Sequence, residues 1–326
     1  MSTLAAPHPH RDSPPHLTHQ GLIYGSDEAF LTEMTPFCLD GLEADDAVLA
    51  VTTEHNIGLL RQTLGDAARE VGFVDADDWY DTPGRTLGAY YRYVEQRTTG
   101  GRHRQVRVIG EPVWHGRDPL ETAEWTRYES VINVAFALCP AWIVCPYDTR
   151  ALPDDVVADA RRTHPELVSG HSAWASHHYA APDTDRGIWQ RRLQPVPADG
   201  KEAVMRFGDD LTVVRAFVAQ AAHTLGLPSD RARRLVFAVN EVATNALQYG
   251  DGNQGQVTLR RCGHRVVCDV TNPGRAAGPD WYMGYLPPDP VGQRGHGLWA
   301  VRQLCDLMEV DTRPGETTVR LHLAMA

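Results

Sequence analysis

Apolar segments with the length of strands alternate with helix-like segments along the first two thirds of the chain. Strands are expected at 46–52, 70–76, 104–114 and 141–148, and helices at 56–65, 86–98, 121–138 and 153–164. Strands that alternate with longer helices are typical of a mostly parallel sheet that is covered by helices on both faces. The pattern therefore predicts an α/β domain in this part of the chain.

The composition changes at 181–202, where Pro, Gly and Asp residues interrupt the alternation. We expect a linker at 183–202 between a domain at 20–182 and a second domain at 203–326. The second domain is expected to begin with a strand and two helices, at 211–227 and 230–249, the latter capped by Ser229. A hairpin that turns at Gly263 and His264 and a loop should follow. The domain is expected to end with a helix at 297–305 and strands at 306–312 and 316–323. This order predicts an α+β sandwich with helices on one face of a mixed sheet.

The net charge of -11 argues against a nucleic-acid surface and indicates protein or small-molecule partners. No apolar run has the length of a membrane span, and the first residues lack a signal-peptide core, so we expect a cytoplasmic protein without membrane contact. Residues 1–19 are rich in Pro and His; a metal site on these histidines is an alternative, but their irregular spacing favours a disordered tail. The six cysteines form no CxxC pair, which gives a zinc site little support and favours buried, reduced thiols.

A polar pair, Glu241 and Asn245, lies in the segment NEVATNALQYG. The apolar residues of the surrounding helix recur at helical spacing and form its core face: Leu235, Val239, Val242 and Ala246. Glu241 and Asn245 are four residues apart, so both project from another stripe of the helix. Taken alone, the pair would be an ordinary solvated stripe.

Three further features follow this pair in a fixed order: Asn272 and Gly274 at the end of a strand, Gly292, Gly295 and Gly297 at the start of a helix, and Thr317 and Thr318 on the last strand. Glycines before a helix let backbone N–H groups approach a phosphate, and the helix N-terminus favours anions. A glycine string alone is weak support for a phosphate site. The ordered set of four features, the polar pair included, is much more specific for such a site.

These segments resemble the Bergerat ATP-binding fold of histidine kinases, gyrase, Hsp90 and MutL, and in particular the anti-sigma factor serine kinases of the RsbW type. NEVATNALQYG resembles the N box, TNPG the first glycine box and GQRGHGLWAVRQLCD the second, within about 200–326. The resemblance implies Glu241 as general base, Asn245 as the Mg²⁺ ligand, and ATP bound by Asn245, Asn272, Gly274, Gly292, Gly295, Gly297, Thr317 and Thr318. It also implies a sigma factor and an anti-anti-sigma (STAS) protein as partners, and it allows a homodimer.

Three positions depart from the pattern of that family. The first glycine box usually carries an Asp that accepts a hydrogen bond from the adenine amino group, whereas this chain has Asn272. Arg275 and Ala276 follow Gly274 where a second glycine is usual, and Tyr249 stands where many relatives carry His. Because charge-assisted hydrogen bonds are stronger than neutral ones, replacement of Asn272 by Asp is expected to tighten ATP binding about tenfold.

The N-terminal domain resembles the MEDS sensory domain in four segments: GLIYGSDEAFLTEMTPFCLDGLEADDAVLAVTTEHN, VRVIGEPVW, YESVINVAF and CPYD. The resemblance implies a fold akin to RecA-type P-loop domains and the sensing of a small ligand, with hydrocarbon derivatives as one class. The phosphate-binding GxxxxGK[ST] motif is absent from the sequence, so nucleotide hydrolysis is not expected in this domain.

Six residues of this domain are candidates for ligand binding: Glu111, Trp114, Glu129, Asn133, Tyr147 and Asp148. Glu111 and the pair Tyr147 and Asp148 follow predicted strands, and ligands of α/β sheets bind at the carboxyl ends of strands. Glu129 and Asn133 are four residues apart on a helix. Helix capping or buried hydrogen bonds are the alternative roles for all six, and Cys145 is expected in the core.

Two functions follow from the sequence. In the first, the sensory domain controls an anti-sigma factor that has ATP-dependent serine/threonine kinase activity toward an anti-anti-sigma partner. In the second, the ATPase fold is a catalytically weak or inactive binding module that regulates a partner by sequestration alone. Glu241 with Asn245 favours the first function, and Asn272 favours the second. A metabolic α/β enzyme lacks support, because the sequence shows no nucleophile–base motif.

Overall fold

The computed structural model describes residues 16–182, 192–197, 199–200, 202–274, 282–288 and 296–325. The chain forms two compact units: unit 1 has residues Met1–Asp81 and Ala89–Asp185, and unit 2 has residues Thr82–Gly88 and Arg186–Ala326. Most of the expected N-terminal tail, together with Gly292 and Gly295, lies outside the described residues. Within the described ranges, no helix has both the length and the apolar character needed to span a membrane.

Unit 1 contains a seven-stranded sheet with the strand order β3-β2-β4-β5-β1-β6-β7. Its strands are β1 (Thr18–Tyr24), β2 (Ala47–Thr52), β3 (Gly72–Asp75), β4 (Val106–Gly110), β5 (Ala141–Asp148), β6 (Glu166–Ser169) and β7 (Ser172–Ala175). Neighbouring strands run parallel, except that β7 pairs antiparallel with β6. The central strands β2 and β4 are buried along their whole length, as expected of a sheet covered on both faces. The predicted mostly parallel α/β sheet is confirmed.

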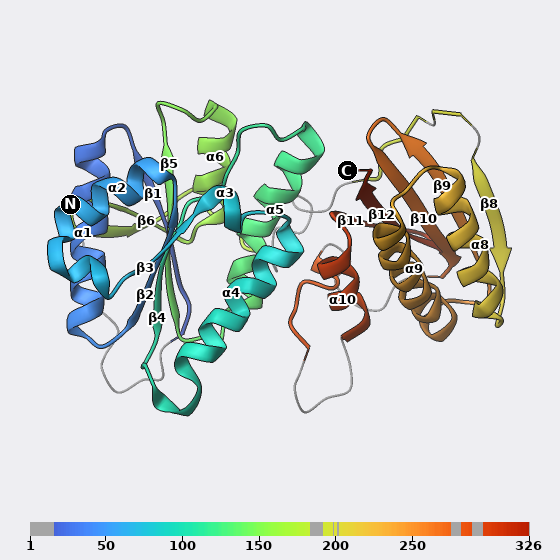
Figure 1. The fold of residues 1–326 in the computed structure, drawn as a ribbon, viewed down its shortest axis with the longest axis horizontal. Helices are drawn as coiled ribbons and strands as arrows, with labels where there is room; N and C mark the ends of the chain where they lie inside the picture. The colour runs from blue at the N-terminus through green and yellow to red at the C-terminus, as the bar shows by residue number, and fades with distance from the viewer. Residues whose placement is uncertain are drawn as a thin grey trace. The chain divides into compact units, whose positions relative to one another are not determined.

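The helices of unit 1 are α1 (Asp27–Glu43), α2 (Glu54–Leu64), α3 (Ala76–Trp79), α4 (Pro83–Thr98), α5 (Pro119–Ala135) and α6 (Asp154–Thr163), with 3-10 turns at Gly65–Arg69 and Thr99–Gly101. Residues 83–88 of α4 belong to unit 2. α1 and α2 lie on one face of the sheet, and α4 and α5 lie on the other (Figure 1). α6 packs beside α5. Under α1 and α2, buried side chains such as Phe30, Leu60 and Val144 form the core of that face.

The sequence pattern does not predict β1, α1 or the β6–β7 pair. β1 begins at Thr18, so Thr18 and His19 belong to the sheet, and their assignment to the tail at 1–19 is wrong. Pro36 obscures the helical pattern of α1, yet the helix runs through it. β6 and β7 have only 4 residues each, which is too short for an alternation to stand out.

Unit 2 is built on a five-stranded sheet with the order β11-β12-β10-β9-β8. Its strands are β8 (Ala203–Phe207), β9 (Gly255–Cys262), β10 (Arg265–Pro273), β11 (Leu307–Arg313) and β12 (Glu316–Ala324). Every neighbouring pair is antiparallel, so the prediction of a mixed sheet is wrong, although the α+β class is confirmed. The hairpin between β9 and β10 turns at Gly263 and His264, as predicted, and places Cys268 opposite Leu259.

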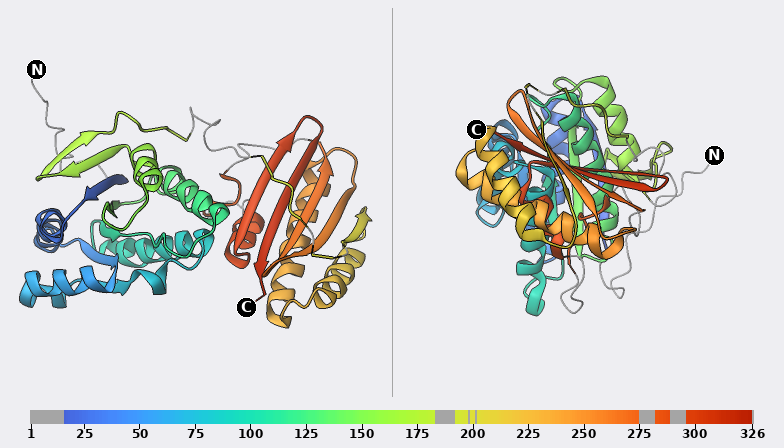
Figure 2. Two further views of the ribbon diagram at one scale, coloured as in Figure 1. Left: turned by 90° about the horizontal axis from the view of Figure 1, so that it is seen from above. Right: turned by 90° about the vertical axis from the view of Figure 1, so that its right-hand side faces the viewer.

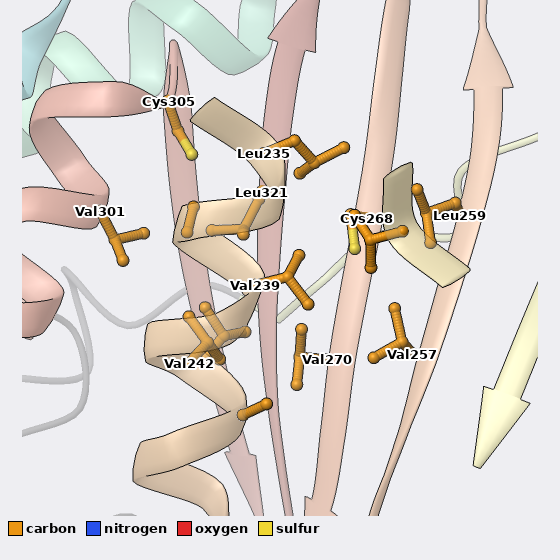
Figure 3. Close-up of a cluster of buried hydrophobic side chains, with 14 of the residues drawn as sticks. Leu235, Val239, Val242, Val257, Leu259, Cys268, Val270, Val301, Cys305 and Leu321 are labelled. Carbon is orange, nitrogen blue, oxygen red and sulfur yellow. The ribbon is translucent and has the colours of Figure 1, made fainter. Parts of the chain in front are cut away.

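The helices of unit 2 are α8 (Leu211–Thr224), α9 (Ser229–Tyr249) and α10 (His296–Leu304). α8 and α9 lie against one face of the sheet (Figure 2). Figure 3 shows Leu235, Val239 and Val242 of α9 facing the strands, with Val301 and Cys305 beside them, which confirms the predicted core face. All six cysteines are free thiols, as expected, but Cys139 and Cys262 are only half-buried, so the prediction of burial is wrong for these two.

The predicted cap of α9 at Ser229 is wrong by one residue. The helix begins at Ser229, and the capping position is Pro228, which offers no side-chain hydrogen bond. Proline is compatible with this position because its fixed φ suits the start of a helix.

Candidate functional site

Glu241 and Asn245 lie on a half-buried stripe of α9, beside its core face. Glu241 faces the first turn of α10, because a Cβ atom added to Gly297 would lie 2.7 Å from Glu241 Oε2. A Cβ atom at position 297 would have to push this carboxylate aside, so glycine is what lets Glu241 approach the first turn of α10. The structure thus brings together Glu241 and Gly297, which are far apart in the sequence.

The C-terminal end of α9 meets the end of β10. The backbone N–H of Asp251 donates to the carbonyl of Pro273 over 3.0 Å, and that of Gly274 donates to the carbonyl of Gly315 over 3.0 Å. Gly274 has a φ of 95°, and a Cβ atom there would lie 2.6 Å from the Asp251 nitrogen. Position 274 therefore needs glycine for its backbone conformation and for space.

Asn272 on β10 and Thr317 on β12 are cross-strand partners, and both are buried. Thr317 Oγ1 donates to the Gly274 carbonyl oxygen over 3.1 Å. Asn272 Nδ2 donates to the Pro273 carbonyl oxygen over 2.9 Å. Because the backbone holds its amide nitrogen, Asn272 has its side-chain oxygen left to accept a hydrogen bond from a ligand.

Thr318 lies on the other face of the sheet. Side chains alternate along a strand, and Val319, two residues from Thr317, packs into the core under the helices. The Thr318 hydroxyl instead shares a hydrogen bond of 2.9 Å with Thr271 Oγ1. The prediction that Thr318 joins Thr317 in the cofactor site is therefore wrong.

Gly250 is a site residue that the sequence pattern does not single out. A Cβ atom at this position would lie 2.4 Å from the Ala246 carbonyl oxygen and 2.5 Å from Asn272 Nδ2. The glycine that ends α9 thus makes room for the Asn272 side chain. The only sequence feature that could have pointed to Gly250 is its position directly after the predicted helix.

A cleft of about 810 Å³ opens in unit 1 at the carboxyl ends of β1, β2, β4 and β5. Three of the six predicted ligand residues, Glu111, Trp114 and Asp148, line this cleft. Its volume lies in the range of small-molecule sites, and its position is the one predicted for ligands of α/β sheets.

Glu111 accepts several hydrogen bonds in the wall of the cleft. Tyr24 Oη donates to its Oε1 over 3.0 Å, Asn56 Nδ2 donates to its Oε2 over 2.9 Å, and the Thr52 hydroxyl also donates to Oε2. Burial and the nearby Glu111 raise the pKa of Tyr24, so its hydroxyl remains a donor. Sequence reasoning missed Tyr24 and Asn56, because only the folded sheet brings them to Glu111.

Asp148 belongs to a charged group at the rim of the cleft. Arg150 Nη2 lies 2.8 Å from Asp148 Oδ2 and 2.9 Å from Asp27 Oδ1, and His55 Nε2 lies 2.9 Å from Asp27 Oδ2. The Arg150 guanidinium, followed by His55, lowers the pKa of Asp27. The rim therefore carries charged groups of both signs next to the aromatic wall formed by Trp114.

The other three predicted ligand residues do not line the cleft. Tyr147 is buried behind Trp114, with ring centroids 6.2 Å apart. Glu129 and Asn133 lie with His19 in a separate buried cluster. A shared helix stripe predicted their proximity correctly but not the side chains that they face.

The two units thus define a two-domain protein, in which an α/β unit with a ligand-sized cleft accompanies an α+β unit with a nucleotide-type arrangement of glycines. Residues 18–165 match the family model of MEDS, the "MEthanogen/methylotroph, DcmR Sensory domain", and residues 208–323 match that of the histidine kinase-like ATPase domain. The chain therefore combines a MEDS sensory domain with a histidine kinase-like ATPase domain.

Two solved structures are similar to part of the chain. The RsbU and RsbW domains of Rv1364c from Mycobacterium tuberculosis align with a TM-score of 0.30 and 16% identity, over 39% of this chain and 32% of that chain. The Acinetobacter baumannii histidine kinase AdeS aligns with a TM-score of 0.24 and 12% identity, over 37% of this chain and 67% of that chain. The chain thus spans about a third of the length of the first structure. Among curated proteins, the comparison found no match.

Histidine kinase-like ATPase domains bind ATP and Mg²⁺, and the described residues of unit 2 fit these cofactors. Gly274 and Gly297 leave space that a side chain would otherwise fill. Glu241 and Asn245 offer the oxygen atoms that Mg²⁺ prefers. Of the three glycines predicted at the phosphates, Gly297 alone lies within the described ranges, so Gly292 and Gly295 stay predictions.

Replacement of Asn272 by Asp is expected to destabilise unit 2 without tightening ATP binding. An oxygen would take the place of Nδ2 and face the Pro273 carbonyl oxygen, in a space already limited by Gly250. Loss of this hydrogen bond should lower the free energy of unfolding by roughly 1–3 kcal/mol. Denaturant unfolding would measure the loss, and calorimetric titration with ATP would measure the affinity.

The matched control is Asn253→Asp, since Asn253 is exposed in the loop between α9 and β9. A surface substitution of this kind should change stability little. A tenfold gain in ATP affinity for Asn272→Asp at unchanged stability would instead support the expectation from sequence.

Proposed function

We propose that this protein is an anti-sigma factor with ATP-dependent serine/threonine kinase activity, controlled by a small ligand in the cleft of the MEDS domain. The observation that carries the proposal is the contact of Glu241 with the glycine that opens α10, inside a histidine kinase-like ATPase domain. This arrangement sets a carboxylate beside a helix N-terminus, where phosphate groups bind favourably.

Glu241 is the proposed general base. It would take the proton from a serine or threonine hydroxyl of the partner as that oxygen forms its bond to phosphorus. Asn245, one turn further along α9, is proposed to hold Mg²⁺, and the free oxygen of Asn272 to accept from the adenine amino group. Bound Mg²⁺ and ATP supply the phosphoryl group and the neutralising charge, with ADP as the leaving group.

The proposed partners are a sigma factor, which is sequestered, and an anti-anti-sigma STAS protein, which is phosphorylated. Partner binding is proposed for the helical face of unit 2, where Val213 on α8 and Phe237 on α9 are exposed by 53% and 45%.

The second candidate is a binding module that regulates its partner by sequestration without phosphoryl transfer. Asn272 favours it, because the amide offers adenine a neutral acceptor in place of a carboxylate. The two functions differ in one measurable result, namely whether phosphate appears on the partner.

The test is incubation of the full chain with γ-labelled ATP, Mg²⁺ and purified STAS proteins. We expect label on a serine or threonine of one STAS protein. Asn245→Ala should abolish Mg²⁺-dependent ATP binding and labelling without changing the melting temperature of the apo protein, since Asn245 lies off the core face. The control Gln220→Ala should keep both activities, because Gln220 is an exposed amide on α8 whose side chain contacts Thr224. ATP binding without any labelling would favour the binding module.

A further inference from the structure

Four side chains with metal-binding atoms meet in the interior of unit 1. His19 comes from β1, Glu129 from α5 and Cys145 from β5, and His164 directly follows α6. Their exposed fractions are 4%, 1%, 1% and 0%, and one donor atom from each lies within 4.8 Å of all the others. None of the four lines the cleft, so the cluster is distinct from the candidate ligand site.

The separations within the cluster match those of ligands around a four-coordinate ion. Cys145 Sγ lies 3.4 Å from His19 Nε2. Glu129 Oε2 lies 3.6 Å from His19 Nε2 and 3.5 Å from His164 Nε2. A tetrahedral site with bonds of about 2.0–2.3 Å has edges of roughly 3.3–3.8 Å. The two oxygen–nitrogen separations exceed the usual length of a hydrogen bond but suit atoms that share an ion.

The surrounding structure turns both imidazole rings so that Nε2 faces the cluster. His19 Nδ1 lies 3.0 Å from Asn133 Oδ1, and the amide nitrogen of Asn133 donates to the Thr163 carbonyl over 2.8 Å. Asn133 therefore presents its oxygen to His19, and Nδ1 of His19 carries the proton. His164 Nδ1 donates to the Ala160 carbonyl over 2.8 Å. Metal-binding histidines are oriented in this way by a hydrogen bond from the other ring nitrogen.

Buried polar atoms of the cluster lack hydrogen-bond partners in the described part of the chain. They include both carboxylate oxygens of Glu129 and Nε2 of His164. The buried Glu129 carboxylate faces the two Nε2 atoms at 3.5–3.6 Å without a hydrogen bond of normal length, and a cation between these atoms would stabilise it.

We propose that these four side chains form a binding site for one divalent transition-metal ion of the Zn²⁺ type. Two imidazole nitrogens, a thiolate and a carboxylate fill the four positions of a tetrahedral ion, and the two anionic ligands balance its charge. A closed set of this kind leaves no open position for catalysis. The ion instead ties β1 and β5 to α5 and α6.

A line of aromatic contacts connects this site to the cleft. The ring of Trp114, which lines the cleft, lies 6.2 Å from the ring of Tyr147, and Tyr147 lies 5.6 Å from His164. Pro146 also lines the cleft and directly follows Cys145. The bound ion therefore fixes the residues behind one wall of the cleft.

The test is titration of the chelator-treated, reduced full chain with Co²⁺ and then with competing Zn²⁺. We expect one ion per chain, the visible absorption bands of tetrahedral Co²⁺, and a near-ultraviolet charge-transfer band from the thiolate ligand. Cys145→Ala should lose the charge-transfer band and bind at least about 100-fold more weakly. The matched control Cys38→Ala removes another buried thiol of unit 1 and should keep both band and affinity.

A second variant keeps the test decisive if Cys145→Ala does not fold. Asn133→Ala leaves all four ligands in place but removes the group that orients His19, and it should weaken Co²⁺ binding about 10- to 100-fold. Absence of the tetrahedral Co²⁺ spectrum in the natively folded parent protein would overturn the site. The site would also be overturned if Cys38→Ala lost the thiolate band and Cys145→Ala retained it.

Discussion

Glu241→Gln is expected to slow phosphoryl transfer to the STAS partner by about 100- to 10,000-fold, the usual contribution of a general base. The amide has the shape of the carboxylate, so it fits against Gly297 without a new collision, but it cannot take up a proton. ATP affinity and the free energy of unfolding should change little, because Glu241 lies outside the core of unit 2. Single-turnover labelling of the partner at saturating ATP measures the rate, and calorimetry measures the affinity.

The matched control for this variant is Glu316→Gln. Glu316 is an exposed carboxylate at the start of β12, so its neutralisation should leave the transfer rate unchanged. An unchanged rate in Glu241→Gln would place the base elsewhere. Loss of ATP binding in the same variant would show that the carboxylate serves the cofactor rather than proton transfer.

Glu111→Ala is expected to lower the free energy of unfolding of unit 1 by roughly 3–5 kcal/mol, because three buried donors lose their acceptor. Tyr24, Thr52 and Asn56 would each lose the acceptor that they share. A buried donor without an acceptor costs about 1–3 kcal/mol. Hydrogen exchange of the peptides that contain β1, β2 and α2 would report on unit 1 separately from unit 2.

Glu54→Ala provides the comparison for Glu111. Glu54 also lines the cleft, but it is exposed at the start of α2, so its removal should cost less than about 1 kcal/mol. The loss in free energy of unfolding for Glu111→Gln should lie between those of Glu54→Ala and Glu111→Ala, because the glutamine amide keeps one oxygen acceptor. Equal losses for Glu54→Ala and Glu111→Ala would mean that the hydrogen bonds to Glu111 contribute little.

Local periodicity predicted much of the fold. The apolar stripe of α9 was readable because each member, such as Leu235 or Val239, recurs within one or two turns of the next. The β9–β10 hairpin was readable because its two strands are neighbours in the sequence. The antiparallel order of unit 2 was missed, since a strand pattern gives the face of each residue but not the direction of its neighbour.

Residues that act through distant pairing could not be predicted. His19 was predicted to belong to a polar tail, because its neighbours in the sheet, such as Ile143 on β5, are far away in the sequence. The four residues of the metal cluster follow no ligand spacing, because the fold alone assembles them. Thr318 is a different case: strand alternation was visible in the sequence, yet the family pattern grouped Thr318 with Thr317.

The central position of β1 has a consequence for the synthesis of the protein. Both neighbours of this strand, β5 and β6, follow it in the chain, and the first partner of Thr18, Trp142, is made about 120 residues later. At about 5–20 residues per second, the ribosome needs roughly 6–25 s to produce that partner. During this interval the apolar segment containing Leu22 has no strand to pair with, so the nascent chain offers a binding segment to chaperones until β5 emerges.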